Sequence, residues 1–114
     1  MSLIVELGGG DNPAANAYID LDFANAHHAL RDRPEWAAAD EAARSAAILA
    51  ATEHLDTGYR WKGSRKLASQ PLAWPRRDAR DEEGVVQSLV PDIVRRACAE
   101  LALRALDGPL APDI

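Results

Sequence analysis

The sequence predicts a mainly α-helical domain of three to four helices, with a short β-hairpin or extended arm and extended termini. Composition is the main reason. Alanine occurs 23 times in 114 residues, whereas leucine, isoleucine, valine and phenylalanine together supply only 24 residues. With so few large apolar side chains, the helices must pack closely through small residues to bury a sufficient core. The length corresponds to a single domain, 1–114.

The first part of the chain combines a short apolar run with one capped helix. Residues 3–7 predict an edge strand, and the glycine-rich loop 8–13 follows it because Gly permits positive φ and Asn-Pro disfavours helix. Asp20 is suited to be the N-cap of a helix from Leu21 to about Arg31. Pro34 then breaks this helix or begins the next connection.

The segment from about Asp40 to Leu55 predicts the second helix, because alanine has the highest helix propensity. Gly58 is suited to end it. Small residues on one face would allow another backbone to approach closely. This face is expected to hold Ala43, Ala46, Ala47, Ala50 and Ala51, with Ile48, Leu49 and Leu55 alongside.

A third, amphipathic helix of about 16 residues is predicted near the C-terminus. Pro91 suits its first turn, Asp92 complements the positive end of its dipole, and Gly108-Pro109 closes it. Its apolar face is expected to hold Ile93, Ala97, Leu101 and Ala105, flanked by Val94, Cys98 and Leu106.

Between the last two helices lies an unusual basic and aromatic segment, the arm, at about residues 59–90. Extended runs at 59–61 and 72–74 predict a small hairpin, Pro75 excludes a longer central strand, and 78–84 reads as a solvated loop. From Arg60 to Arg80, seven basic residues face one acidic residue, a net +6, whereas the rest of the chain carries six basic and 17 acidic residues, −11, for a total of −5. This charge favours a patch for phosphate or an acidic partner, or pairing with the acidic body of the same chain.

The tryptophans of the arm permit two interpretations. Aromatic rings between Arg and Lys can stack unpaired bases while the cations follow phosphates, which would give Trp61 and Trp74 a role in binding single strands. Alternatively, Trp36, Trp61 and Trp74 fill the core, because other large side chains are scarce.

No residues that would form a catalytic, cofactor-binding or metal site are found, and the sequence predicts a protein that is not an enzyme. The loop 8–10 lacks the Lys-Ser/Thr of a P-loop and the spacing of a dinucleotide site. His27 and His28 point about 100° apart on a helix, and the pairs His28/Asp32 and His54/Asp56 are too weak to make a metal site. Cys98 is expected to be a buried, inert thiol. Without a membrane span or signal peptide, the chain is expected to be made in the cytoplasm.

Several motifs along nearly the whole chain resemble a family of short tailed-phage proteins that act as head-tail connectors or adaptors, some of which are described as DnaT-like single-stranded-DNA-binding proteins. The most specific are the Trp-Lys-Gly and Leu-Ala-Trp-Pro-Arg pieces. The matching segments are Met1-Ser2-Leu3-Ile4-Val5-Glu6, Asn16-Ala17-Tyr18-Ile19, Ala50-Ala51-Thr52-Glu53-His54-Leu55-Asp56, Tyr59-Arg60-Trp61-Lys62-Gly63, Gln70-Pro71-Leu72-Ala73-Trp74-Pro75-Arg76, Val90-Pro91 and Ala97-Cys98-Ala99-Glu100-Leu101-Ala102.

The connector resemblance implies a ring, commonly of twelve copies, beneath the portal protein and above a tail-completion or stopper protein. Duplex DNA would pass through it without sequence-specific binding, and the protein would reside at the head-tail junction of the virion after synthesis in the host bacterium. A C-terminal tail at 108–114 would dock on the portal through Leu110 and Ile114. The expected contacts with partners or neighbouring copies are Arg60, Lys62, Arg65, Lys66, Arg76 and Arg77, with Tyr59, Trp61 and Trp74 as the aromatic residues of the arm.

The alternative function comes from another class of protein. In it the chain is a phage DnaT-like single-stranded-DNA-binding protein or replication accessory protein that uses Trp61 and Trp74.

Overall fold

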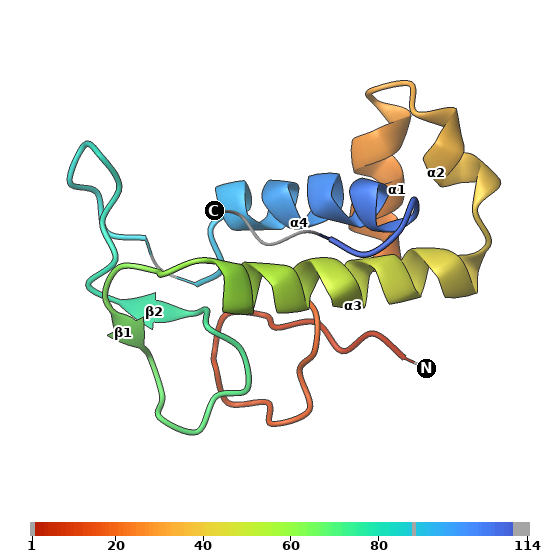
Figure 1. Cartoon of the computed structure of the whole chain (residues 1–114). Coiled ribbons are helices and arrows are strands. Elements are labelled where there is room, and N and C mark those ends of the chain that lie inside the picture. The colour runs from red at the N-terminus through yellow and green to blue at the C-terminus, as the bar shows by residue number, and fades with distance from the viewer. Residues whose placement is uncertain (1, 88, 111–114) are drawn as a thin grey trace.

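The computed structural model describes residues 2–87 and 89–110. It confirms a mainly helical fold with a small antiparallel hairpin (Figure 1). The elements in chain order are α1 (Leu21–Ala29), α2 (Pro34–Ala38), α3 (Glu41–Gly58), β1 (Ser64–Arg65), β2 (Arg76–Arg77) and α4 (Asp92–Ala105).

Helices α3 and α4 pack along each other and form the centre of the molecule (Figure 1). Helices α1 and α2 lie toward the beginning of α3, whereas the arm extends from its end. Trp36 of α2, Ile48 of α3 and Cys98 of α4 are among the most deeply buried side chains, so these three helices contribute to one core. Within the described residues, none of the helices has both the length and the apolar character needed to span a membrane.

The predicted Asp20 cap is confirmed, and Asp40, where the second helix was expected to begin, proves to be an N-cap as well. The Asp20 carboxylate accepts a hydrogen bond from the Phe23 N–H at 2.7 Å, and the Asp40 carboxylate accepts one from the Ala43 N–H at 2.7 Å. Each satisfies an N–H group that the helix itself leaves without a partner. Pro34 begins the short helix α2, which the sequence left as a break or a connection.

The predicted apolar faces of the two long helices are only partly correct. In α3 the buried residues are Ser45, Ala47, Ile48, Ala51, Thr52 and Leu55, whereas Ala43 and Ala46 are exposed. In α4 they are Val94, Cys98, Ala99, Leu101 and Ala102, whereas Ile93 is 68 % exposed. Thr52 can be buried because its hydroxyl donates to the Ile48 carbonyl at 3.0 Å and accepts from the Tyr18 N–H at 3.3 Å.

The expected edge strand at residues 3–7 is wrong. Within the part of the chain that the structure describes, this segment forms a single isolated parallel bridge, between Val5 and Ala17. Hydrogen bonds such as that from the Glu6 N–H to the Ala17 carbonyl (2.9 Å) hold it to the chain that precedes α1. The glycine-rich loop closes instead around Glu6, whose carboxylate accepts hydrogen bonds from the N–H groups of Gly8 (2.8 Å) and Gly10 (3.1 Å). The loop therefore folds around one oxygen, Oε2, of a carboxylate of its own chain.

The predicted hairpin exists, but its predicted pairing is wrong. Ser64 pairs with Arg77 and Arg65 with Arg76, rather than 59–61 with 72–74. Gly63 fixes this register: its φ is +73°, and a Cβ built on it would lie 1.9 Å from the Arg77 carbonyl oxygen. Residues 78–84 form the expected exposed loop except for buried Ala79. Leu110 packs partly buried against the core, and Ile114 lies outside the described residues.

Candidate functional site

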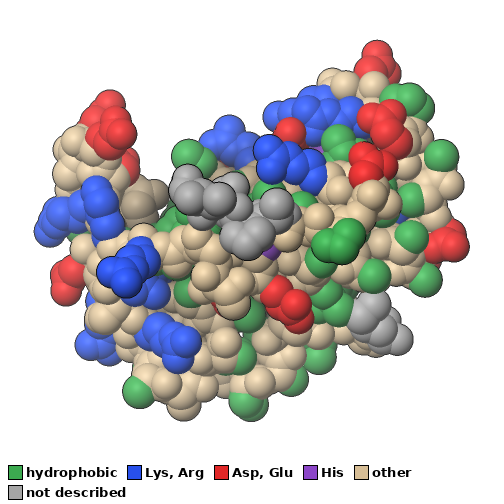
Figure 2. All heavy atoms as spheres, in the orientation of Figure 1, with side chains coloured by type: hydrophobic (Ala, Val, Ile, Leu, Met, Phe, Trp, Pro, Cys, Tyr) green, Lys and Arg blue, Asp and Glu red, His purple; other side chains and the backbone are tan. Residues whose placement is uncertain are grey.

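The arm carries most of the basic side chains that face solvent at its end of the molecule. Figure 2 shows Lys and Arg side chains gathered over the region of β1 and β2. Among the described residues, none of the exposed cations on the arm forms a salt bridge with a carboxylate, which argues against internal pairing as their main role. Arg80 is exposed as well, but it donates to the Gly84 carbonyl at 2.8 Å. The other five exposed residues, called here the arm cations, are Arg60, Lys62, Arg65, Lys66 and Arg77.

Arg76 differs from the arm cations because its guanidinium faces the backbone of the arm. It donates to the carbonyls of Lys62 (2.7 Å), Gly63 (2.9 Å) and Ala73 (3.0 Å), with a longer bond to Trp61 (3.4 Å). A planar donor group that bonds several carbonyls at once holds the two sides of the hairpin together. The structure thus gives Arg76 a scaffolding role within the site that the sequence assigned to binding.

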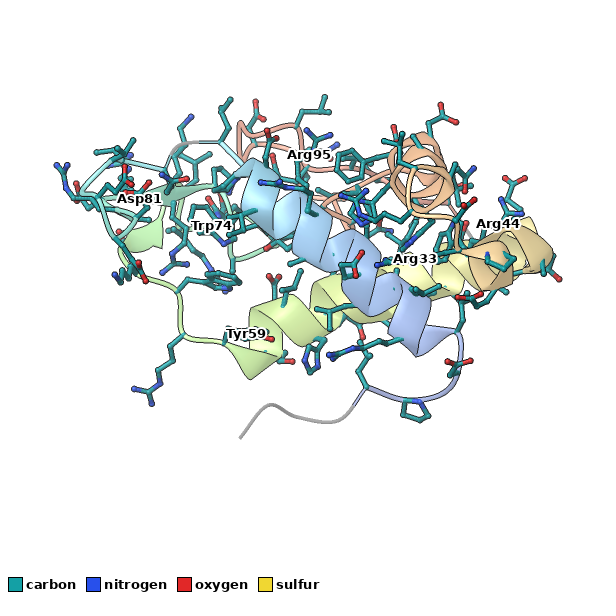
Figure 3. All side chains as sticks on the ribbon, turned by 90° about the horizontal axis from the view of Figure 1, so that it is seen from above. Arg33, Arg44, Tyr59, Trp74, Asp81 and Arg95 are labelled. Atoms are coloured by element: carbon teal, nitrogen blue, oxygen red, sulfur yellow. The ribbon has the colours of Figure 1, made fainter. Side chains whose placement is uncertain are left out.

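The three arm aromatics form a row in which exposure decreases from one ring to the next. The ring centroids of Tyr59 and Trp61 are 5.7 Å apart, and those of Trp61 and Trp74 are 5.5 Å apart. Tyr59 is 38 % exposed at the C-terminal end of α3, Trp61 is half-buried, and Trp74 is only 4 % exposed (Figure 3). The Trp61 indole N–H donates to the Leu55 carbonyl at 3.1 Å, which fixes this ring against α3. Tyr59, whose ring also meets the His54 ring edge-on with centroids 5.9 Å apart, is therefore the most exposed ring of this row.

A buried polar pair connects the arm to the body. The Tyr18 hydroxyl donates to the Asp56 carboxylate and accepts from the Trp74 N–H at 3.1 Å, while the other Asp56 oxygen accepts from the Ala73 N–H at 3.2 Å. Burial raises the pKa of Asp56 above its usual value. Burial and the nearby Asp56 charge raise the pKa of Tyr18, so its hydroxyl keeps its proton. Nothing in the sequence indicated this pair, because 38 residues separate its members.

Gln70 is a second positioning residue that the sequence did not reveal. It is almost fully buried, and its amide N–H₂ donates to the carbonyls of Leu72 (2.9 Å) and Pro75 (2.8 Å). Its amide oxygen accepts from the Leu67 N–H at 2.9 Å. One side chain thus shapes the connection between β1 and β2.

The groups that come nearest to a metal site are His27, His28 and Glu100, whose ligand atoms lie within 4.8 Å of one another. The Arg33 guanidinium already lies among them: it pairs with the Glu100 carboxylate and lies 3.3 Å from His28 Nδ1. His28 Nε2 is 2.9 Å from the Ala99 carbonyl, so this nitrogen carries the proton and Nδ1 can accept from Arg33. Arg33 therefore supplies the cation of this cluster, which joins α1 to α4.

Cys98 gives no support to nucleophilic catalysis. Cys98 is fully buried, as expected, and burial raises the pKa of its thiol to about 11. A thiol in this environment is protonated and unreactive at neutral pH. The absence of catalytic activity stays a prediction.

Together these features define a small helical domain with a rigidly supported basic arm and an accessible aromatic ring, an arrangement typical of nucleic-acid-binding modules. The whole chain, residues 1–114, matches the model of the family described as "Putative DnaT-like ssDNA binding protein", and the protein belongs to this family. Neither a curated protein nor a solved structure matches the chain.

This family membership corrects the expectation of a structural head-tail connector of the virion. It points to single-stranded DNA, and not to a portal protein, a tail-completion or stopper protein, a ring of copies or passing duplex DNA. The connector part of the resemblance misled because two of its matching segments, 59–63 and 70–76, contain the residues that build the arm. Arg76, Gln70 and Trp74 bond or pack within the chain, so they specify the scaffold and not the partner.

Proposed function

We propose that this protein binds single-stranded DNA along the arm. The arm cations contact the phosphates, and an unpaired base stacks on Tyr59. The observation that supports this most strongly is the juxtaposition of five exposed cations without carboxylate partners, within the described residues, and an exposed aromatic ring.

The distribution of charge favours approach of a polyanion to the arm. The chain has a net charge of −5, although the segment from Arg60 to Arg80 is strongly basic. The acidic body repels phosphate, whereas the basic segment attracts it. Asp81, Glu82 and Glu83 follow this segment in the exposed loop and place negative charge at its border. The field of the protein thus directs DNA to β1 and β2.

The aromatic row supports a single-stranded rather than a duplex ligand. A base stacks on a protein ring only when one of its faces is free, as in an unpaired strand. Tyr59 offers the exposed ring, Trp61 packs against Tyr59, and Trp74 packs against Trp61. Of the two tryptophans that the sequence offered for stacking, Trp74 is buried in the core and Trp61 is held against α3.

The charge contribution can be tested with a labelled oligo(dT) and a duplex of equal length, by fluorescence anisotropy at several salt concentrations. We expect tighter binding of the single strand, and Lys62→Glu should weaken it and lower the salt slope by about 0.7 for each phosphate that the protein no longer neutralises. Arg104→Glu is the matched control because it makes the same charge change at an exposed position of α4, away from the arm. Equal weakening in both variants, or no binding at low salt, would contradict the proposal.

Stacking is tested separately at Tyr59. Tyr59→Ala should cost about 1–3 kcal/mol of binding free energy, the range for removal of one stacked base. Tyr59→Phe keeps the ring and should bind nearly as the natural protein does. If both variants bind equally well, no base stacks at this position.

A further inference from the structure

We infer that the single strand continues from the arm onto a second basic surface, a groove between α1 and α4. This inference rests on the proposed function and extends its site. The groove has a volume of about 390 Å³, and its basic and apolar walls are formed by Arg31, Arg33, Arg96, Ile93 and Ala97. It is called here the α1–α4 groove.

The groove, like the arm, is positively charged in a chain whose net charge is −5. Arg31 donates to the His27 carbonyl at 2.9 Å, and Arg96 donates to the Asp92 carbonyl at 3.4 Å. Because both hydrogen bonds go to the backbone, neither arginine has its charge compensated by a carboxylate among residues 2–87 and 89–110. Glu100, the acidic residue of the groove, is already paired with Arg33.

Two other arginines of the body, Arg44 and Arg95, are held by contacts within the chain. Arg44 donates to the carbonyls of Ala37 (3.1 Å) and Ala39 (2.9 Å) and thereby holds the end of α2. Arg95 lies over the Phe23 ring, 4.6 Å from its centroid, and 3.7 Å from the Asp92 carboxylate. Arg31 and Arg96 are therefore the groove cations most available to an external anion.

The position of the groove relative to the arm favours one continuous binding surface for the single strand. Helix α4 begins directly after the arm and runs toward α1 (Figure 1), and Arg96 lies in its second turn. Figure 2 shows Lys and Arg side chains in two groups on one face, over β1 and β2 and along the edge formed by α1 and α4. The longest dimension of the molecule is 39 Å. A strand that contacts both groups must follow much of this length.

The chemistry of the groove fits a nucleic-acid strand. Guanidinium groups bind phosphate oxygens through two hydrogen bonds at once, which lysines cannot do. Ile93 is 68 % exposed beside these arginines and offers an apolar surface to a base or sugar. An acidic peptide would find the same charges, so the experiment includes it as a competing ligand.

The test is a length series of labelled oligo(dT), from about 6 to 30 nucleotides, bound to the full chain. The affinity of the natural protein should rise with length beyond the segment that the arm holds. Arg96→Glu should weaken binding of the longest strand roughly tenfold, as expected when one or two phosphates are no longer neutralised, and leave binding of the shortest unchanged. Arg104→Glu again serves as the control, because it lies on the same helix and is also exposed.

The outcomes separate this inference from the proposed function. If Arg96→Glu weakens binding of neither the shortest nor the longest oligo(dT), or weakens both equally, the strand does not continue into the groove. Binding of the shortest strand by Lys62→Glu still tests the arm in that case. Binding of an acidic peptide such as oligo-glutamate that Arg96→Glu abolishes, with DNA binding unchanged, would assign the groove to a protein partner and overturn the inference. Failure of every oligonucleotide to bind would contradict the proposed function itself. Thermal unfolding of each variant verifies that it folds.

Discussion

At the scale of single residues, Tyr18 has the widest consequences because its hydroxyl joins three segments distant in sequence. It lies just before α1, donates to Asp56 on α3 and accepts from the Trp74 N–H before β2. In a buried position, a polar group that loses its partner costs more than the hydrogen bond itself contributes. The orientation of the arm thus depends on one phenol group that lies outside it.

Tyr18→Phe is therefore expected to lower the free energy of unfolding by about 1–3 kcal/mol, because it leaves the Asp56 oxygen and the Trp74 N–H without a partner. Urea unfolding followed by tryptophan fluorescence measures this decrease. Ser69→Ala also removes one hydroxyl, from an exposed residue of the arm, and should change stability by less than about 0.5 kcal/mol. Equal effects of the two substitutions would show that the buried pair contributes little.

At the scale of elements, the helices were predictable wherever a local signal marks their ends. Asp20 and Asp40 cap α1 and α3 with their own side chains, and Pro91 precedes α4, so nearby residues suffice. The buried faces were less predictable, because burial of Thr52 depends on a hydrogen bond from Tyr18, 34 residues away. Ile93, although apolar, remains exposed because the packing of α4 on α3 and α1 turns Val94 and Cys98 inward instead.

The register of the hairpin was likewise not predictable from its own residues. The short extended runs at 59–61 and 72–74 favoured pairing of these two segments. In the structure these residues are drawn into other contacts: the Trp61 indole bonds to α3, and the Ala73 N–H bonds to Asp56. The strands form farther along, where Gly63 permits close approach of the Arg77 carbonyl.

Gly63→Ala should consequently disrupt the arm. Its φ of +73° is unfavourable for a side chain, and the new Cβ would clash with the Arg77 carbonyl oxygen and the Ala79 nitrogen. Gly84→Ala is a matched control, because Gly84 has a φ of +84° but nothing lies within 4 Å of a Cβ there. We expect Gly84→Ala to cost about 1 kcal/mol of stability and Gly63→Ala clearly more. Urea unfolding measures both, and similar costs would mean that the arm adjusts to the added atom.

Disruption of the arm should also appear in binding. Gly63→Ala should weaken oligo(dT) binding at least as much as Lys62→Glu does, whereas Gly84→Ala should leave it nearly unchanged. Normal DNA binding by a Gly63→Ala protein that folds would separate the hairpin geometry from the function.

At the scale of the whole molecule, the basic segment of the site was predictable but its ligand was not. The charge of residues 60–80 is a property of the sequence, and it indicated phosphate or an acidic partner equally. Which cations are available depends on the fold: Arg76 faces the backbone, whereas Lys62 and Arg65 face solvent. The α1–α4 groove was invisible in the sequence because Arg31, Arg33 and Arg96 come together only when α1 packs on α4.

The junction of α1 and α4 also gives the molecule a pH dependence that can be isolated. The hydrogen bond from Arg33, aided by His27, lowers the pKa of Glu100 to about 2 from an ordinary value of 4.5. A carboxyl group whose pKa is lowered by folding stabilises the folded state fully above its unfolded pKa, and this contribution disappears as the pH falls toward the folded pKa. The window for Glu100 therefore extends from about pH 4.5 down to about 2.

We expect Glu100→Gln to be less stable than the natural protein at pH 6, and the difference in unfolding free energy to shrink steadily between pH 5 and pH 3. The effect will be modest, because the Glu100 side chain is 46 % exposed and solvent screens the pair. The pH dependence of Asp56 has the opposite sign, because burial raises its pKa and the folded state is therefore favoured at lower pH. The quantity to measure is therefore the difference in unfolding free energy between Glu100→Gln and the natural protein, in which the contribution of Asp56 cancels. Glu53→Gln, at an exposed position of α3, is the control. A difference for Glu100→Gln that stays constant from pH 6 to 3 would show that Arg33 and His27 do not stabilise the ionised carboxylate, and the junction of α1 and α4 would then depend on apolar packing and the hydrogen bond from His28 to the Ala99 carbonyl.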